Sequence, residues 1–258
     1  MSTPPQLASN CFVTICVQCH NFQKRLCWML SSLKQQTLRY FVVDVAHMVG
    51  NGRPSTESII EFFLEQGLLI IARPYVDPHR FERRGYTRND QLAGARTPWV
   101  WFADCDHVYH PAFMARLNDA LELQSGEEMR VLSAGRRSSN VGTTSYMVDA
   151  SIGESPVCVC DVFAKAKSLA PLGRRRMCGA GHTQIVRRHG IHNGVYVPEG
   201  KSRDWAWSTT KCYKTPSDVA FRRRCGGVVG LGRWFARNQI HLNHVRDSDV
   251  GWHIDDQR

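Results

Sequence analysis

Apolar residues follow two alternating patterns along the first half of the chain. Short runs rich in β-branched and aromatic residues predict buried strands at 12–17, 41–45, 68–72 and 99–103. Apolar residues at helical spacing predict helices at 23–36, 55–66, 83–95 and 111–123. Thr56 is the candidate cap of the second of these helices. Strands that alternate with helices in this way predict βαβ units, and therefore an α/β fold with a mainly parallel, Rossmann-like sheet flanked by helices.

The second half of the chain is less regular. We expect a strand at 157–163, a glycine turn that leads into another strand at 179–187, and a helical turn at 218–224. The chain contains no internal repeat and no low-complexity linker. Its 258 residues therefore fit one α/β domain with a soft boundary near 124–128.

The charge of the chain points to a negatively charged partner. The formal net charge is +10, from 33 Lys and Arg against 23 Asp and Glu. The excess is concentrated in the second half, in arginine clusters at 136–137, 174–176, 187–188 and 222–224. Guanidinium groups suit bidentate phosphate contacts, so these clusters indicate a polyanion, although many of them are expected to serve a diphosphate or to form solvated faces.

Membrane spans and structural metal sites are not expected from the sequence. No apolar run approaches the roughly 18 residues of a membrane span, and residues 1–10 lack the basic and apolar segments of a secretory signal. A cytoplasmic location is the default expectation. The ten cysteines are expected to be reduced, buried thiols. Cys16 lies within a strand pattern, and no second pair at zinc-finger spacing accompanies Cys16 and Cys19.

A pair of carboxylates follows the fourth predicted strand directly, in Asp104-Cys105-Asp106. Such a pair can hold Mg²⁺ or Mn²⁺, with phosphate oxygens and water completing the shell. An isolated Asp-x-Asp is more often a solvated acidic turn, so other residues must support the metal site. Ligands of parallel sheets bind at the carboxyl ends of the strands, and Cys19-His20-Asn21 and Asp44 are expected to converge there with the two carboxylates.

The order and spacing of these motifs resemble family 2 glycosyltransferases, which bind nucleotide-diphospho-sugars with a GT-A fold. The resemblance covers about 12–247 and implies a nucleotide-sugar-binding half at 1–125, followed by a less regular acceptor-binding and catalytic half of the same domain at 126–258. The donor-binding residues that it implies are His20, Asn21, Arg25, Asp44, Arg88, Asn89, Asp104, Gly179 and Gly181. Asp44 falls where the family reads a uracil ring, so the implied donor is a UDP-sugar.

The resemblance also implies a cofactor, Mn²⁺ or Mg²⁺, held at the Asp-x-Asp pair. Asp106 would bind the metal directly, and Asp104 would contact the ribose or reach the metal through water. A C-terminal imidazole would complete the protein ligands. We favour His244 over His241, and His107 is a third contender. A lone histidine is more often structural than a ligand.

Asp218 is the candidate catalytic base. It lies in a segment similar to the family's acidic helix, in which a Glu-Asp pair precedes Phe, Arg and Gly, but Ser217 replaces the Glu here. A positioned carboxylate that takes the proton of an acceptor hydroxyl contributes on the order of 10²- to 10⁴-fold, and direct displacement would invert the anomeric centre. The alternative role of Asp218 is that of a helix cap.

The acceptor is open to three hypotheses. Trp205, Trp207 and Arg222 are candidate acceptor contacts, because aromatic faces stack on sugars or bases, although core packing of the tryptophans is equally expected. The arginine clusters and the compact single domain favour a hydroxymethylated base in DNA as the acceptor. The habit of the family favours a saccharide or lipid-linked saccharide at an anionic membrane surface. The absent Glu at Ser217 leaves room for a non-catalytic nucleotide-sugar-binding module. The hypothesis we favour is a metal-dependent, inverting hexosyltransferase.

Overall fold

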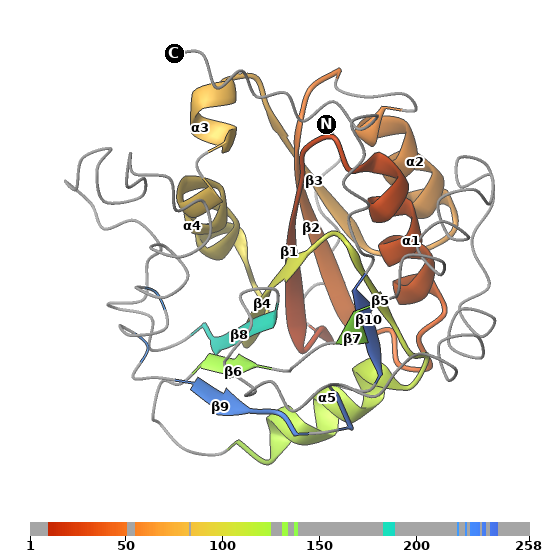
Figure 1. The fold of residues 1–258 in the computed structure, drawn as a ribbon, viewed down its shortest axis with the longest axis vertical. Helices are drawn as coiled ribbons and strands as arrows, with labels where there is room; N and C mark the ends of the chain where they lie inside the picture. Colours follow the sequence, from red (N-terminus) through yellow and green to blue (C-terminus); the bar gives the residue numbers. More distant parts are fainter. Residues whose placement is uncertain are drawn as a thin grey trace.

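The computed structural model describes residues 10–50, 55–82, 84–124, 131–133, 137–138, 183–188, 221, 225, 228–232, 234–235 and 238–241. Within these residues, the fold consists of a seven-stranded sheet, helices on both of its faces and a smaller three-stranded sheet (Figure 1). No described helix is long and apolar enough to cross a membrane.

Four parallel strands from the first half form one side of the large sheet. They are β1 (Val13–Cys19), β2 (Phe41–Met48), β3 (Ile70–Tyr75) and β4 (Trp99–Asp104). The order across the whole sheet is β3-β2-β1-β4-β8-β6-β9. The helices that cover the sheet are α1 (Gln23–Lys34), α2 (Thr56–Glu65), α3 (Pro78–Glu82), α4 (Arg84–Gly94) and α5 (Phe113–Glu122).

The remaining strands are short and come mostly from the second half. They are β5 (His107–Tyr109), β6 (Val131–Ser133), β7 (Arg137–Ser138), β8 (Thr183–Arg187), β9 (Val228–Gly230) and β10 (Gln239–His241). Strand β8 is antiparallel to both β4 and β6, and β9 is parallel to β6. Strand β10 joins β5 and β7 in the small sheet. Segments from both halves of the chain therefore complete the same sheet beside β4.

Side chains alternate along β1 between two hydrophobic clusters. Ile15 and Val17 belong to the main cluster together with residues of α1, α2 and α5, whereas Cys16 belongs to a second cluster with residues of α4. A strand with both faces buried is expected in a parallel sheet covered by helices. Cys16 and Cys19 consequently lie in different clusters, which rules them out as a zinc pair.

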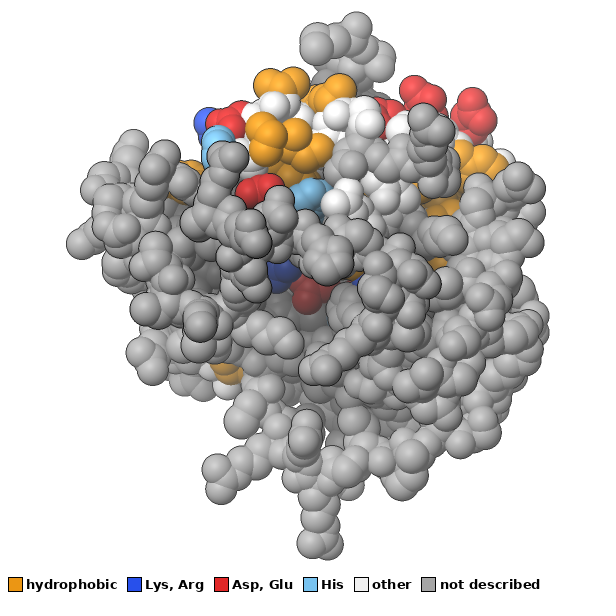
Figure 2. Space-filling view, turned by 45° about the horizontal axis from the view of Figure 1, so that its top comes forward, with side chains coloured by type: hydrophobic (Ala, Val, Ile, Leu, Met, Phe, Trp, Pro, Cys, Tyr) orange, Lys and Arg blue, Asp and Glu red, His pale blue; other side chains and the backbone are white. Residues whose placement is uncertain are grey.

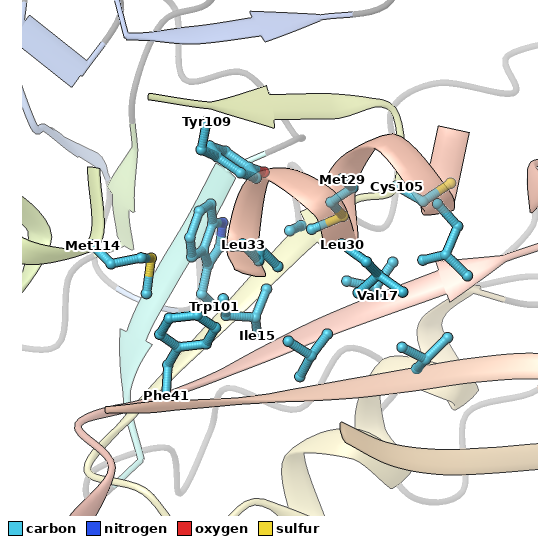
Figure 3. Close-up of a cluster of buried hydrophobic side chains, with 14 of the residues drawn as sticks. Ile15, Val17, Met29, Leu30, Leu33, Phe41, Trp101, Cys105, Tyr109 and Met114 are labelled. Carbon is cyan, nitrogen blue, oxygen red and sulfur yellow. The ribbon is translucent and has the colours of Figure 1, made fainter. Parts of the chain in front are cut away.

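The main cluster is built around aromatic rings beneath α1 (Figure 3). Trp101 stacks on Phe113 with ring centroids 5.6 Å apart and meets Tyr109 edge-on at 5.0 Å. Leu33 of α1 is fully buried against this group. These contacts hold β4, β5 and α5 together, and so fix where the chain turns after β4.

The predicted alternation of strands and helices is confirmed for the first half, with corrections at α3 and at the cap of α2. The chain is already helical before the helix expected at 83–95, in α3. The cap of α2 is Ser55, whose Oγ accepts a hydrogen bond from the Ser58 amide at 3.2 Å. Thr56 instead faces inward and accepts a bond from Gln23. Strands β5, β6, β7, β9 and β10 had not been expected. The strand expected at 157–163 lies outside the described residues.

The cysteines that the structure describes are free and buried, as expected. They are Cys11, Cys16, Cys19, Cys27, Cys105 and Cys225.

We predict that Leu33→Ala lowers the free energy of unfolding by about 2–5 kcal/mol, because it leaves a cavity in the main cluster. The matched control is Leu123→Ala, since Leu123 follows α5 and is 80% exposed. This variant should change the stability by no more than about 0.5 kcal/mol. Urea denaturation measures both, and similar losses from the two variants would contradict the packing described above.

Candidate functional site

The carboxyl ends of β1 and β4 lie side by side and carry the candidate residues. Gln18 of β1 pairs with Asp104 of β4 in parallel register. The chain leaves β1 through His20 and Asn21, and Asn21 has a positive φ of 57°. Asparagine tolerates this backbone conformation better than most residues, so it suits the tight turn into α1. The His20 ring packs edge-on against Phe81 with centroids 5.6 Å apart.

Asp104 lies between two arginines of α4. Its Oδ1 is 3.6 Å from Nη1 of Arg84 and 3.6 Å from Nη2 of Arg88. Arg84 is exposed, whereas Arg88 is buried with its guanidinium 5.6 Å above the Phe102 ring. Asn89 follows Arg88 on α4 and is partly buried. The expected Arg88-Asn89 pair is thus on the helix that borders the carboxylate.

Asp106 is largely buried next to a histidine and near a third arginine. Its Oδ1 is 2.8 Å from Nδ1 of the buried His107. Arg25 of α1 lies 4.5 Å above the Phe22 ring. Desolvation lowers the pKa of Arg25, and the nearby charge of Asp106 opposes that shift. The turn between β4 and β5 therefore joins acidic and basic groups from several elements.

In the small sheet, two of the three candidate histidines are backbone partners on neighbouring strands. His107 opens β5, and its partner in the antiparallel pairing with β10 is His241. The side chain of His241 and the whole of His244 lie outside the described residues. Among the described residues, no three His, Cys, Asp or Glu side chains are grouped to hold a metal ion. Asp104 and Asp106 supply the hard carboxylate oxygens that Mg²⁺ or Mn²⁺ prefers, so the donor set fits the expected cation.

Asp44 is fully buried in the middle of β2. Arg73 of β3 donates to both of its carboxylate oxygens, from Nε at 3.2 Å and from Nη2 at 2.6 Å. Gln91 of α4 donates to Asp44 Oδ1 at 3.3 Å and to the Asp44 and Val17 carbonyls. Gly94 of α4 leaves room for this guanidinium, because a Cβ added at Gly94 would clash with Arg73 Nη2. The role of Asp44 as a uracil reader stays a prediction, and Arg73 would have to share or release the carboxylate for it.

The Asp44–Arg73 pair also affects the pKa of Arg73 itself and of the Cys16 thiol. Burial by itself would lower the pKa of Arg73, but the hydrogen bond and the charge of Asp44 outweigh it and raise that pKa. Burial raises the pKa of the Cys16 thiol well above its usual value, and Asp44 adds to this shift. Arg73 therefore stays a cation and Cys16 a neutral thiol.

Seven of the candidate residues lie outside the described residues. They are Gly179, Gly181, Trp205, Trp207, Asp218, Arg222 and His244. Two described neighbours of these residues lie near β4. Thr183, the first residue of β8, pairs with Ala103 directly before Asp104. Phe221 is fully buried and meets Phe102 edge-on at 5.7 Å.

The arginines at 187–188 lie at the other end of the sheet. Arg187 pairs with Trp99 at the start of β4. Its guanidinium lies 5.3 Å from the Trp99 ring and donates to the Gln124 carbonyl at 3.0 Å. Arg187 thus packs against the fold, far from the Asp104 end of the strand.

Figure 2 turns the top of Figure 1 forward. Acidic, basic and histidine side chains of the described residues are visible on this face (Figure 2). Exposed apolar residues border the carboxyl edge, because Val49 and Val76 directly follow β2 and β3 and are 53% and 82% exposed.

Sequence reasoning missed Gln91 as a partner of the buried Asp44. Arg88 and Gln91 are three positions apart in the sequence, and both are buried on the same helix. That spacing was a usable signal, because residues three apart lie on one helical face. The contact of Cys19 with Cys105 has no local signal, because it depends on the register of β1 and β4.

Comparisons with known proteins identify the fold. No family model matches the sequence, and no curated protein sequence matches it. The structure resembles the GT-A glycosyltransferase TarS of S. aureus, with a TM-score of 0.59, 13% identity and 90% of this chain covered. For TarS residues 1–349 the TM-score is 0.59 with 18% identity and 89% of this chain covered, and for their complex with UDP it is 0.56 with 16% identity and 85% covered.

These matches confirm the expected GT-A fold. This chain spans 37% of the length of TarS, and 60% and 57% of the two structures of its residues 1–349. At these levels of identity, the similarity concerns the arrangement of strands and helices.

We predict that Arg73→Ala lowers the free energy of unfolding by about 3–5 kcal/mol, because it leaves the buried Asp44 carboxylate without its cation. Adding Asp44→Asn should recover part of that loss, with a coupling energy of about 1–3 kcal/mol. Arg80→Ala is the control, since its ion pair with Asp90 is exposed and should contribute no more than about 1 kcal/mol. Strictly additive losses at Asp44 and Arg73 in urea denaturation would contradict this coupling.

Proposed function

We propose that this chain is a glycosyltransferase that moves a sugar from a nucleotide-diphospho-sugar to a hydroxyl group. The observation that carries the proposal is the meeting of two carboxylates, Asp104 and Asp106, with the β1 turn at one edge of a GT-A sheet. Ligands bind at this edge in open α/β sheets. His20 and Asn21 of the turn would contact the nucleotide, and the arginines around the carboxylates would contact its diphosphate.

The charges at this edge suit a departing diphosphate. When bound, a divalent cation would supply the positive charge that stabilises the leaving group. Asp106 would hold it, and Asp104 would contact the ribose or reach the cation through water. His107, which lies 2.8 Å from Asp106, would orient this carboxylate. An imidazole of His244 or His241 would be the further protein ligand, and the pairing of His241 with His107 supports a site near β10.

The buried arginine beside Asp104 has a separate task. Arg88 is held over the Phe102 ring and lies 3.6 Å from Asp104. A guanidinium held in this way keeps its charge at a fixed position without water around it, which strengthens its interaction with developing negative charge. Arg84 is exposed, so water screens its charge and its contribution would be smaller.

The donor nucleotide would be uridine diphosphate, read by Asp44 with Arg73 and Gln91. An acceptor hydroxyl would lose its proton to Asp218 and displace the diphosphate directly, with inversion at the sugar. This role of Asp218 rests on the resemblance to family 2 enzymes. The burial of Phe221 against Phe102 supports it, because this contact ties the segment three residues after Asp218 to the strand that ends at Asp104.

The acceptor that we propose is a hydroxymethylated base in DNA, and the net charge of +10 supports it. Trp205, Trp207 and Arg222 would contact the base and its phosphates. A saccharide or lipid-linked saccharide is the second candidate. Arg187 packs against Trp99, so the cluster at 187–188 does not support DNA binding. The acceptor is therefore tested separately.

We predict that released nucleoside diphosphate will be detected when nucleotide sugars are screened with Mn²⁺ against modified DNA and simple glycans, and that a chelator will stop its release. Asp106→Asn should lower kcat/KM by about 10²- to 10³-fold, because one charged metal ligand is lost. Asp119→Asn on the exposed side of α5 is the matched control and should leave kcat/KM unchanged. Equal rates for the two variants, or full activity in chelator, would refute the proposed chemistry.

For the acceptor, we predict that duplex DNA binds at low salt in a gel-shift titration, and that affinity falls at least about tenfold between 50 and 200 mM salt. Arg222→Ala should weaken binding at every salt concentration. Arg39→Ala provides the comparison, since Arg39 is exposed between α1 and β2 at the amino edge of the sheet. Absence of duplex binding at low salt, together with transfer to a glycan, would replace DNA by a saccharide.

A further inference from the structure

Two cysteines occupy neighbouring positions at the carboxyl edge. Gln18 and Asp104 are partners in the parallel pairing of β1 and β4. Cys19 directly follows Gln18 in the sequence, and Cys105 directly follows Asp104. Adjacent strands lie about 4.8 Å apart, and the Cα atoms of a disulfide are usually about 4.4–6.8 Å apart. The backbone at this position therefore meets the geometric requirement for a disulfide.

The two thiols also face the same side of the sheet. Cys19 and Cys105 both belong to the main hydrophobic cluster, and Figure 3 shows Cys105 beside Val17 at the end of that cluster. The thiols are hydrogen-bonded to each other, and this bond is the main cause of the lowered pKa of Cys19. The Phe22 amide and Thr56 are further partners of Cys19. Both cysteines are free in this structure and are buried, 1% and 5% exposed.

Cys105 separates the two carboxylates of the candidate site. An S–S bond is about 2.05 Å long, much shorter than a hydrogen bond between two sulfur atoms. Forming it would draw Cys105 toward β1 and shift the turn that carries Asp104 and Asp106. A displacement of about 1 Å at a catalytic constellation can cost on the order of 10²-fold in rate.

We propose that Cys19 and Cys105 form a reversible disulfide when the chain meets a peroxide, and that this bond closes the candidate site. In the first step, the Cys19 sulfur attacks one oxygen of hydrogen peroxide, which gives Cys19 sulfenic acid and one water. In the second, the Cys105 sulfur attacks the Cys19 sulfur, which forms the S–S bond and releases a second water. The two thiols lose two electrons and two protons in total, and the peroxide accepts both.

The consequence for donor binding rests on the proposed function, whereas the disulfide itself does not. A small thiol such as dithiothreitol would reverse the reaction by thiol–disulfide exchange. The second cysteine acts here as a resolving residue, which protects the first from further oxidation to sulfinic acid.

The test exposes the full chain to hydrogen peroxide, blocks the remaining thiols with an alkylating agent and maps peptides by mass spectrometry. We expect a cross-linked peptide pair containing Cys19 and Cys105, which disappears after dithiothreitol. Cys27→Ser is the matched control, because Cys27 is a buried thiol of α1 in the same cluster, and it should keep the cross-link. Recovery of Cys19 and Cys105 only as free thiols or sulfinic acids, or joined to other cysteines, would overturn the proposal.

Binding of UDP with Mn²⁺, measured by calorimetry before and after oxidation, gives the functional readout. In the unsubstituted chain, we expect oxidation to weaken UDP binding at least about tenfold. In Cys105→Ser and in Cys19→Ala, we expect the oxidised and the reduced protein to bind UDP with about the same affinity. The two variants remove either partner, so a folding defect in one leaves the other as a test. If oxidation lowered the UDP affinity of the variants as much as that of the unsubstituted chain, the proposed control of the site by the disulfide would be overturned.

The two proposals fail in different ways. Reduced protein that does not bind UDP but forms the cross-link refutes the proposed function and leaves the cysteine pair standing. Reduced protein that binds UDP but forms no cross-link refutes the cysteine pair and leaves the proposed function standing.

Discussion

The parallel pairing of β1 with β4 is the constraint on which the candidate site depends. It places the turn after β1 beside the turn after β4, so residues that are about a third of the chain apart become neighbours. The register is fixed from both faces of β4. Trp101 faces the main cluster and Phe102 the second one, and a slip by one residue would exchange the two. The core of the protein therefore determines where the carboxylates lie.

Electrostatic balance is the second constraint, both at this edge and at Asp44 in the middle of β2. Asp44 is paired with Arg73, Asp104 lies near Arg84 and Arg88, and Asp106 lies beside His107. In the protein alone, each carboxylate thus has a basic neighbour. A nucleotide diphosphate adds further negative charge to a region whose arginines are already engaged. A divalent cation would restore the balance, which gives a physical reason for the metal that is independent of the resemblance to a family.

The order of the elements was predictable where apolar patterns are long. Strands β1 to β4 and helices α1, α2 and α5 have enough apolar positions for their periodicity to be recognised, and these elements define the GT-A fold. The short strands were not predictable. Strands β5, β6, β7, β9 and β10 have three residues or fewer, so they exist because a neighbouring strand offers hydrogen bonds.

Among the described residues, the sequence predicted that the turn after β1 lies beside the carboxylates after β4, but it did not predict how these side chains are engaged. Asp104 and Asp106 were recognised from their position after a strand, and this reasoning needed no tertiary information. The buried pair of Asp44 with Arg73 depends on the register of β2 and β3, which joins Ala46 to Arg73. The contact of Cys19 with Cys105 depends in the same way on the register of β1 and β4. Such pairings become visible only when strands distant in sequence are aligned.

The most direct test of this account is a crystal structure of the chain grown with UDP and Mn²⁺, with the manganese located by its anomalous scattering. The account predicts a manganese ion about 2.0–2.2 Å from an Asp106 oxygen, bridging to the diphosphate, with the nucleotide over the ends of β1 and β4. Manganese bound elsewhere, or UDP bound at another edge of the sheet while Asp104 and Asp106 remain unoccupied, would contradict it.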